Sequence, residues 1–141
     1  MNEGPPVRGI VIGHGALADG LVDAVRQITG AGEEVLVPLS NRGLSPETLV
    51  AEVRRRTDDA PAVIFTDLPS GSCSLAARRL CHERRNLVAI GGVNLPLLLE
   101  FVVHRHLPLE ELARRLVEKG RAGITCTPAD LEAYARRAVS S

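Results

Sequence analysis

The stretch VRGIVIGHGALADGL, residues 7–21, joins a short apolar run to a helical pattern through a histidine that stands between two glycines. Residues 10–12 are apolar and β-branched, which is typical of a buried strand, here predicted over residues 7–13. Beyond Gly15, apolar residues recur at three- and four-residue intervals, and this spacing predicts a helix over residues 16–29. A strand that passes directly into a helix is the first half of a β–α–β unit, so the stretch indicates an α/β fold.

The same alternation of strand and helix continues along the chain. Further strands are predicted at residues 35–37, 62–66 and 87–90, and further helices at residues 46–56, 72–84, 95–104 and 108–119. Such alternation implies parallel strands joined by right-handed helical crossovers, and the continuously apolar strands suit a sheet that is covered on both faces. We therefore predict an open α/β sandwich with a four-stranded parallel sheet in the order 2-1-3-4, flanked by helices.

The C-terminal part of the chain has a different character. Residues 121–127 are small and β-branched, so this segment is a candidate for a last strand, and residues 128–138 predict a terminal helix that begins at Pro128. We find no internal repeat and no convincing domain boundary. Residues 1–141 are therefore interpreted as one domain, with its core at about residues 7–127.

The charge and the aromatic content argue against two classes of partner. Lysine and arginine together number 17, aspartate and glutamate together number 17, and the formal net charge is zero. The chain has two phenylalanines, one tyrosine and no tryptophan. A basic patch and a base-stacking surface are therefore not expected, which argues against nucleic acid and against an anionic membrane as the main partner.

Cysteine usage and the start of the chain bear on the compartment. The three cysteines, Cys73, Cys81 and Cys126, are odd in number and form no close pair, so we expect neither a disulfide framework nor a zinc site. No metal and no cofactor is expected. Met1 leads into Gly4-Pro5-Pro6, and no apolar run approaches the 18 or so residues of a membrane span. We expect a cytoplasmic protein with no secretory leader and no direct membrane insertion.

Two polar residues stand where the predicted strands end. In open α/β sheets, ligands gather outside the carboxyl ends of the strands, at the point where the strand order reverses. His14 directly follows the first strand and Asp67 directly follows the third, so the order 2-1-3-4 would place them side by side. A carboxylate that binds one imidazole nitrogen fixes the tautomer and leaves the other nitrogen as a nucleophile or base.

The loop after Asp67 adds a candidate anion site. Ser70, Gly71 and Ser72 open a predicted helix, whose free N–H groups and dipole favour an anion. Together the residues predict a phosphohistidine site, with His14 and Asp67 as catalytic residues and Ser70, Gly71 and Ser72 binding the phosphoryl group. Each of these residues also has a structural alternative. His14 could be a structural residue that caps the end of a strand, and Asp67 could cap the helix that starts near Ser72. The loop could be an ordinary helix start.

Other residues near this site also have two interpretations. Asn94 follows the fourth strand and is either part of the site or only a turn and helix cap. Cys73 is either a small buried filler or a reactive thiol at a helix terminus. Leu17, Leu68 and Leu75 are either core residues or part of a docking surface.

Three motifs, each after a predicted strand, resemble those of a known family. They are Gly13-His14-Gly15, then Thr66-Asp67 with Ser70-Gly71-Ser72, and then Gly92-Val93-Asn94-Leu95-Pro96. In this order they resemble the mannose-type (mannose/fructose/sorbose) enzyme IIA of the bacterial sugar phosphotransferase system, over about residues 7–127. The chain departs from the family where Ser70-Gly71-Ser72-Cys73 replaces Gly-Gly-Ser-Pro.

The resemblance implies a function, partners and an assembly. It implies that the histidine-phosphocarrier protein phosphorylates His14 at Nε2, while Asp67 binds the other ring nitrogen, and that the phosphoryl group then passes to a separate IIB protein. It also implies a homodimer in which residues 121–127 form an antiparallel strand that pairs with the partner's sheet edge. A regulatory module, whose phosphorylation state is read by another protein without sugar transport, is the alternative.

Overall fold

The computed structural model describes residues 5–140. Residues 1–4 and residue 141 lie outside the described residues, and so does the start of the chain on which the expectation of no leader rests. The strands are β1 (Arg8–Gly13), β2 (Leu36–Ser40), β3 (Ala62–Thr66) and β4 (Leu87–Gly91). The helices are α1 (Leu17–Thr29), α2 (Pro46–Thr57), α3 (Ser72–Glu83), α4 (Leu95–His104), α5 (Leu109–Ala122) and α6 (Leu131–Ser140). None of the helices in this described part is long and apolar enough to cross a membrane.

The four strands form one parallel sheet in the order β2-β1-β3-β4, which confirms the predicted topology. Ile10 of β1 lies opposite Val37 of β2 and opposite Ile64 of β3, so the carboxyl ends of these strands share one edge of the sheet. Because β1 and β3 are adjacent, the loops that follow them lie next to each other at this edge.

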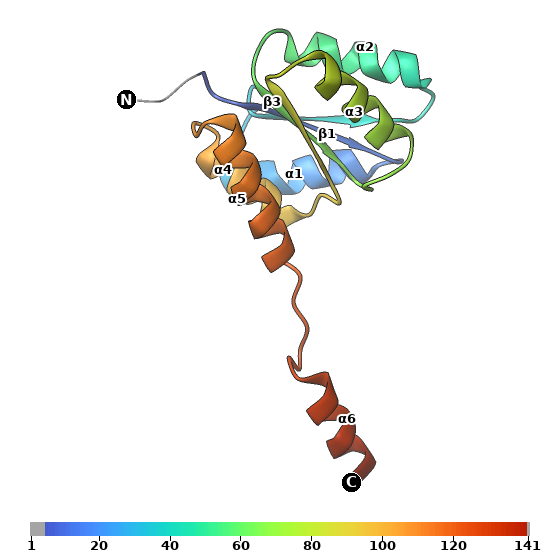
Figure 1. Cartoon of the computed structure of the whole chain (residues 1–141), viewed down its shortest axis with the longest axis vertical. Coiled ribbons are helices and arrows are strands. Elements are labelled where there is room, and N and C mark those ends of the chain that lie inside the picture. The colour runs from blue at the N-terminus through green and yellow to red at the C-terminus, as the bar shows by residue number, and fades with distance from the viewer. Residues whose placement is uncertain (1–4, 141) are drawn as a thin grey trace.

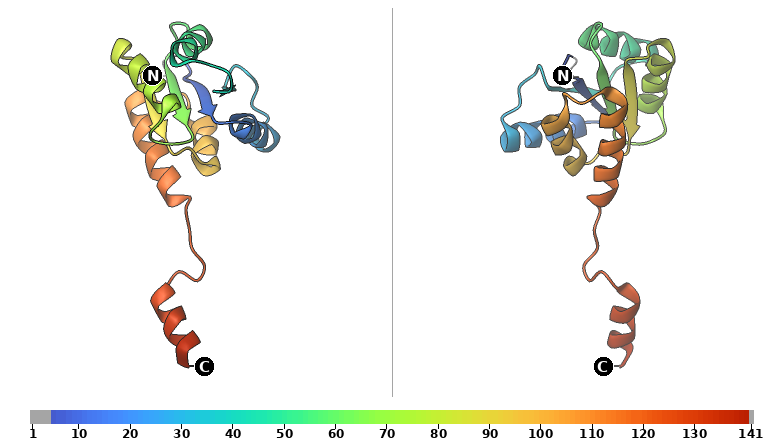
Figure 2. Two further views of the ribbon diagram at one scale, coloured as in Figure 1. Left: turned by 90° about the vertical axis from the view of Figure 1, so that its right-hand side faces the viewer. Right: turned by 60° about the vertical axis from the view of Figure 1, so that its left-hand side comes forward.

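Helices cover both faces of the sheet (Figures 1 and 2). Helices α1, α4 and α5 contribute to one core cluster, and α2 and α3 contribute to the other. Alternate residues of β1 face opposite clusters, Val11 the first and Ile12 the second. In the first cluster, the rings of Phe65 and Phe101 meet edge to face with centroids 5.3 Å apart. Full burial of such side chains contributes about 1.5–3 kcal/mol each, which fixes the sheet that carries the site.

The C-terminal segment differs from the prediction. Residues 121–127 do not form a strand in this single chain, because Arg121 and Ala122 complete α5 and the residues from Gly123 to Asp130 are irregular. The segment leaves the body of the molecule and ends in α6, which stands apart from the sheet (Figure 1). A strand needs a neighbouring edge for its N–H and C=O groups, and the segment has no such neighbour within its own chain. The exchanged-strand homodimer stays a prediction.

Candidate functional site

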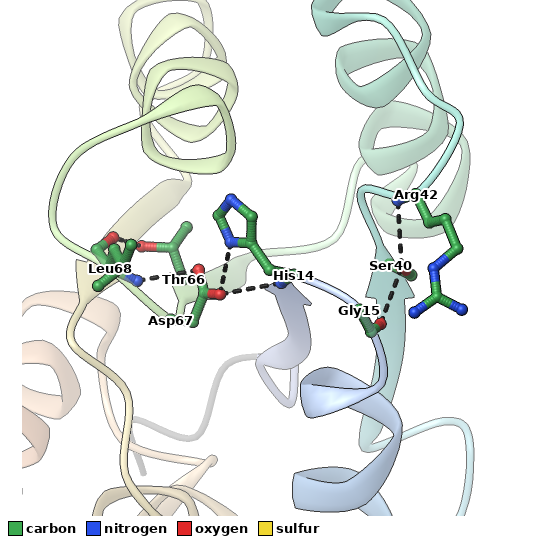
Figure 3. Close-up of polar contacts among 7 residues, drawn as sticks. All are labelled: His14, Gly15, Ser40, Arg42, Thr66, Asp67 and Leu68. Carbon is green, nitrogen blue, oxygen red and sulfur yellow. Dashed lines mark hydrogen bonds and ion pairs between the residues drawn. The ribbon is translucent and has the colours of Figure 1, made fainter.

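The register of β1 and β3 places the first two site residues together. Ile12 and Thr66 are the last paired residues of the two strands, and the N–H of Asp67 continues the ladder by donating to the Ile12 carbonyl at 3.2 Å. The next residue along β3 therefore lies beside the end of β1, where His14 follows Gly13. The predicted juxtaposition of His14 and Asp67 is present (Figure 3).

Asp67 holds His14 by two contacts through one carboxylate oxygen. Oδ2 of Asp67 accepts a hydrogen bond from the backbone N–H of His14 at 2.9 Å and lies 2.7 Å from the ring nitrogen Nδ1. The other oxygen, Oδ1, accepts from the backbone N–H of Leu68 at 2.9 Å. The Asp67 side chain is 8% exposed, whereas that of His14 is 51% exposed. The carboxylate is thus a buried, fixed support, and the imidazole is the group presented to solvent.

The charge of Asp67 determines the tautomer of His14. Burial alone would raise the pKa of Asp67, but the hydrogen bonds from His14 and Leu68, together with the His14 charge interaction, outweigh burial and lower it. The carboxylate is therefore ionised at neutral pH and only accepts hydrogen bonds, so Nδ1 of His14 carries the proton. In the neutral form of the ring, Nε2 then has a free lone pair, and Figure 3 shows it on the side of the ring away from Asp67.

The turn that carries His14 is tied to the neighbouring strand. Gly15 has a φ of 58°, a left-handed conformation that allows the sharp change from β1 to α1. The Ser40 hydroxyl, at the end of β2, donates to the Gly15 carbonyl at 2.9 Å and accepts from the Arg42 N–H at 3.1 Å (Figure 3). Ser40 is not among the predicted site residues. Its position at the end of the second strand, at the same sheet edge as His14, was the available signal.

The loop between β3 and α3 is also held firmly. The Pro69 carbonyl accepts from the Ser74 hydroxyl and from the Arg78 guanidinium, each at 3.0 Å. A Cβ atom at Gly91 would lie 2.6 Å from Cα of Pro69, so only glycine at the end of β4 lets the loop approach this closely. Gly91 is a second residue that the sequence analysis missed, because the approach depends on the path of a loop.

The start of α3 has no side-chain cap. Its N-cap residue is Gly71, and no side chain accepts from the N–H groups of its first turn. By contrast, Ser45 accepts from the Thr48 N–H at the start of α2 at 3.2 Å. The predicted phosphate-binding residues Ser70, Gly71 and Ser72 thus lie at a helix N-terminus without a side-chain cap. Asp67 does not cap α3, so that alternative is wrong.

The first turn of α3 lies beside the histidine. Ligand atoms of His14, Asp67 and Cys73 all lie within 4.8 Å of one another, and Cys73 is the second residue of α3. The structure therefore brings together the elements that bear all five predicted site residues. Cys73 is only 1% exposed, and burial, followed by the charge of Asp67, raises the pKa of its thiol. The thiol is a buried group rather than the activated nucleophile of the second interpretation.

Asn94 has a structural role. Its Oδ1 accepts from the Leu97 N–H at 3.1 Å and so caps α4, while its Nδ2 donates to the Gly120 carbonyl of α5 at 2.8 Å. Both polar groups of this side chain therefore make hydrogen bonds that fix α4 and α5. The cap interpretation of Asn94 is confirmed.

Apolar side chains lie exposed on the elements that carry the site. Leu17, at the start of α1, is 47% exposed, Leu68 is 53% exposed and Leu75, in the first turn of α3, is 54% exposed. None of the three is a core residue. The core interpretation of these three residues is therefore wrong, and the docking-surface interpretation stays a prediction.

Comparisons with known proteins agree with this geometry. The sequence profile of the EIIA-man family, described as the PTS system fructose IIA component, matches residues 9–117. The mannose-specific EIIAB component of Escherichia coli K12 is 32% identical over 82% of this chain, and this chain spans 38% of the length of that relative. The EIIA component from Streptococcus agalactiae has a TM-score of 0.81 at 22% identity, over 88% of this chain and 99% of that one. The mannose/sorbose-specific IIA subunit from Enterococcus faecalis has a TM-score of 0.76 at 20% identity, over 86% and 95% of the two chains.

Proposed function

Because this chain belongs to the EIIA-man family of phosphotransferase-system IIA components, we propose that it is a phosphocarrier of a bacterial sugar phosphotransferase system. In this proposal His14 accepts a phosphoryl group from the histidine-phosphocarrier protein and passes it to a IIB protein. The observation that carries the proposal is the pair of His14 and Asp67, with Nδ1 held 2.7 Å from a buried carboxylate oxygen and the ring half exposed.

The transfer follows from the state of the imidazole. The lone pair on Nε2 of His14 attacks the phosphorus atom of the donor's phosphohistidine, and a new N–P bond forms as the donor's N–P bond breaks. The electron pair of the broken bond stays on the donor's ring nitrogen. The Nδ1 proton remains between His14 and Asp67, whose negative charge balances the positive charge that the ring acquires. Because both bonds are of the same kind, catalysis consists of positioning and electrostatics.

The start of α3 suits the phosphoryl oxygens. The N–H groups around Ser70, Gly71 and Ser72 have no side-chain cap, and the positive end of the helix dipole favours an anion. Cys73, one residue further on, lies close to His14, so a phosphoryl group on the ring would face these donors. We assign these three residues to binding of the phosphoryl group.

The partners would dock on the exposed leucines. Donor and acceptor must in turn bring a reactive side chain to His14, so one surface has to serve both. Leu17, Leu68 and Leu75 lie on the elements next to His14 and supply apolar area for this contact. Exchange of this kind would take place in the cytoplasm, between this IIA domain and other proteins.

The proposal includes a homodimer. Beyond the end of α5, the rest of the segment over residues 121–127 runs away from the body of its own chain (Figure 1). Its Ile124 is exposed and so available to another sheet edge. Pairing of this segment with the edge of the partner's sheet would give its backbone groups the neighbours that they lack in one chain.

The test is phosphorylation of the purified chain. We would incubate the wild type, His14→Ala and the control His106→Ala, which changes an exposed histidine away from the site, with phosphoenolpyruvate, enzyme I and the histidine-phosphocarrier protein. Intact mass should show one acid-labile phosphoryl group on the wild type and the control, and none on His14→Ala. No gain with an active donor would overturn the proposal. Retention of the phosphoryl group in the presence of IIB proteins would favour the regulatory alternative.

A further inference from the structure

We propose that His14, Asp67 and Cys73 form a reversible zinc site, and that a bound zinc ion and a phosphoryl group exclude each other at His14. The spacing of the cysteines predicts no metal site, because spacing alone does not show which side chains the fold brings together. The binding of zinc stands on geometry alone. Its effect on phosphorylation rests on the proposed function.

Three ligands from three separate elements converge at this point. His14 follows β1, Asp67 follows β3 and Cys73 lies in the first turn of α3, and one ligand atom from each lies within 4.8 Å of the other two. In a tetrahedral zinc site, bond lengths of about 2.0–2.3 Å place neighbouring ligand atoms about 3.4–3.6 Å apart. Nδ1 of His14 and Oδ2 of Asp67 are 2.7 Å apart, closer than this spacing, and all three ligand atoms lie within 4.8 Å of one another. The atoms are thus near the required spacing, and binding of an ion requires the contact between His14 and Asp67 to open.

The donor atoms select the ion. A thiolate sulfur, an imidazole nitrogen and a carboxylate oxygen are the three ligand types that zinc takes in proteins. Magnesium and calcium require oxygen ligands and would leave the sulfur of Cys73 without a role. The set therefore favours zinc over the more abundant divalent cations.

The exposure of the ligands indicates an open and reversible site. Cys73 is 1% exposed and the Asp67 side chain is 8% exposed, so the sulfur and the carboxylate are buried on the protein side of the site. The His14 side chain, by contrast, is 51% exposed. An ion would enter from the imidazole side and keep one position for water. Three protein ligands with one open position are the arrangement of zinc sites that exchange ligands, whereas structural zinc sites use four.

Charge and protons balance at the site. A cysteine thiol, whose ordinary pKa is about 8.5, carries its proton at neutral pH when no ion is bound. Zinc forms a bond to the sulfur, the thiol proton leaves to solvent, and the two positive charges of the ion compensate the thiolate and the carboxylate. No oxidation or reduction is involved.

The ion and the phosphoryl group compete for the same ring. Zinc on Nε2 would occupy the lone pair that attacks phosphorus. Zinc on Nδ1 would require the ring proton to move to Nε2, which would then have no lone pair. Either position prevents phosphorylation of His14. By linkage, phosphorylation must weaken zinc binding by the same factor.

Cobalt(II) is the spectroscopic probe for the binding step. We would titrate cobalt, without oxygen, into a Cys81→Ser/Cys126→Ser variant, in which Cys73 is the remaining cysteine. We expect one cobalt per chain, intense tetrahedral bands, and a sulfur-to-cobalt charge-transfer band that zinc abolishes and magnesium does not. Adding Cys73→Ser, or Cys73→Ala where serine disturbs folding, should remove this band and weaken binding more than about tenfold. Absence of the band, or its persistence without Cys73, would overturn the site.

The second arm measures competition. Phosphorylation of the wild type should fall as zinc is added and recover with a chelator, whereas phosphorylation of Cys73→Ser should resist the same zinc concentration. Equal inhibition of both proteins would overturn the competition. A chain that is never phosphorylated would contradict the proposed function, and the cobalt spectra would still decide the zinc site.

Discussion

Replacement of Asp67 by asparagine tests the support of the histidine. The carboxylate accepts from the His14 N–H at 2.9 Å, from Nδ1 at 2.7 Å and from the Leu68 N–H at 2.9 Å. An asparagine has one acceptor oxygen, so in either orientation its NH₂ group faces an N–H donor. One donor left without a partner costs about 1–3 kcal/mol, so the free energy of unfolding should fall by that amount.

The rate of phosphorylation should fall as well. Asp67→Asn removes the charge that balances the phosphorylated ring, and a hydrogen bond to a charged group contributes about 1.5–3 kcal/mol. If that contribution is made in the transition state, the rate falls about 10- to 150-fold. The assay is the initial rate of phosphoryl gain by intact mass at a fixed donor concentration, with urea unfolding to establish that the variant is folded.

The control is Asp59→Asn, which makes the same chemical change at an exposed aspartate before β3, at the opposite end of the strand. It should leave the phosphorylation rate unchanged. A folded Asp67→Asn protein whose rate stays within about threefold of the wild type would refute the role of the carboxylate.

Three further predictions concern stability, the loop and docking. Because the pKa of Asp67 is lowered by folding, its contribution to stability is present above the ordinary carboxyl pKa of about 4 and is lost as the pH falls through the folded value. Acid titration of urea unfolding should show this loss in the wild type and not in Asp67→Asn. Gly91→Ala places a Cβ 2.6 Å from the backbone of the loop after β3, so it should lower the free energy of unfolding by about 1–3 kcal/mol and slow phosphorylation. Gly20→Ala, on α1, places a Cβ that meets nothing within 4 Å. It should raise the free energy of unfolding, measured by thermal unfolding, by about 0.5–1 kcal/mol. Leu75→Glu should raise the donor concentration needed for half-maximal phosphorylation without changing the melting temperature. Val103→Glu, at an even more exposed position on α4 (68% against 54%), should change neither. An unchanged donor requirement for Leu75→Glu would argue against this docking surface.

The sequence predicts most of the fold because the pattern is local. Each strand is a short apolar run, and a helix follows each strand after three to five residues. The element order and the parallel sheet therefore follow from neighbouring residues alone. The pairing of His14 with Asp67 also follows, since adjacent parallel strands bring their carboxyl ends to one edge.

Features that depend on distant contacts could not be predicted in the same way. Strand formation at residues 121–127 needs a neighbouring sheet edge, and Ile124 is 78% exposed in the single chain. The approach of Pro69 to Gly91 depends on the loop path. Burial of Cys73 was foreseen among the alternatives, but its closeness to His14 appears only when α3 is placed over the sheet.

The central claim is that Asp67 holds Nδ1 of His14 and directs Nε2 at the phosphoryl group. The most direct measurement is nitrogen NMR of the phosphorylated chain, with ¹⁵N-labelled histidine, to identify the ring nitrogen that is coupled to phosphorus. The account predicts coupling to Nε2 of His14, with the proton of Nδ1 still present. Phosphorus on Nδ1, or on any other residue, would contradict it.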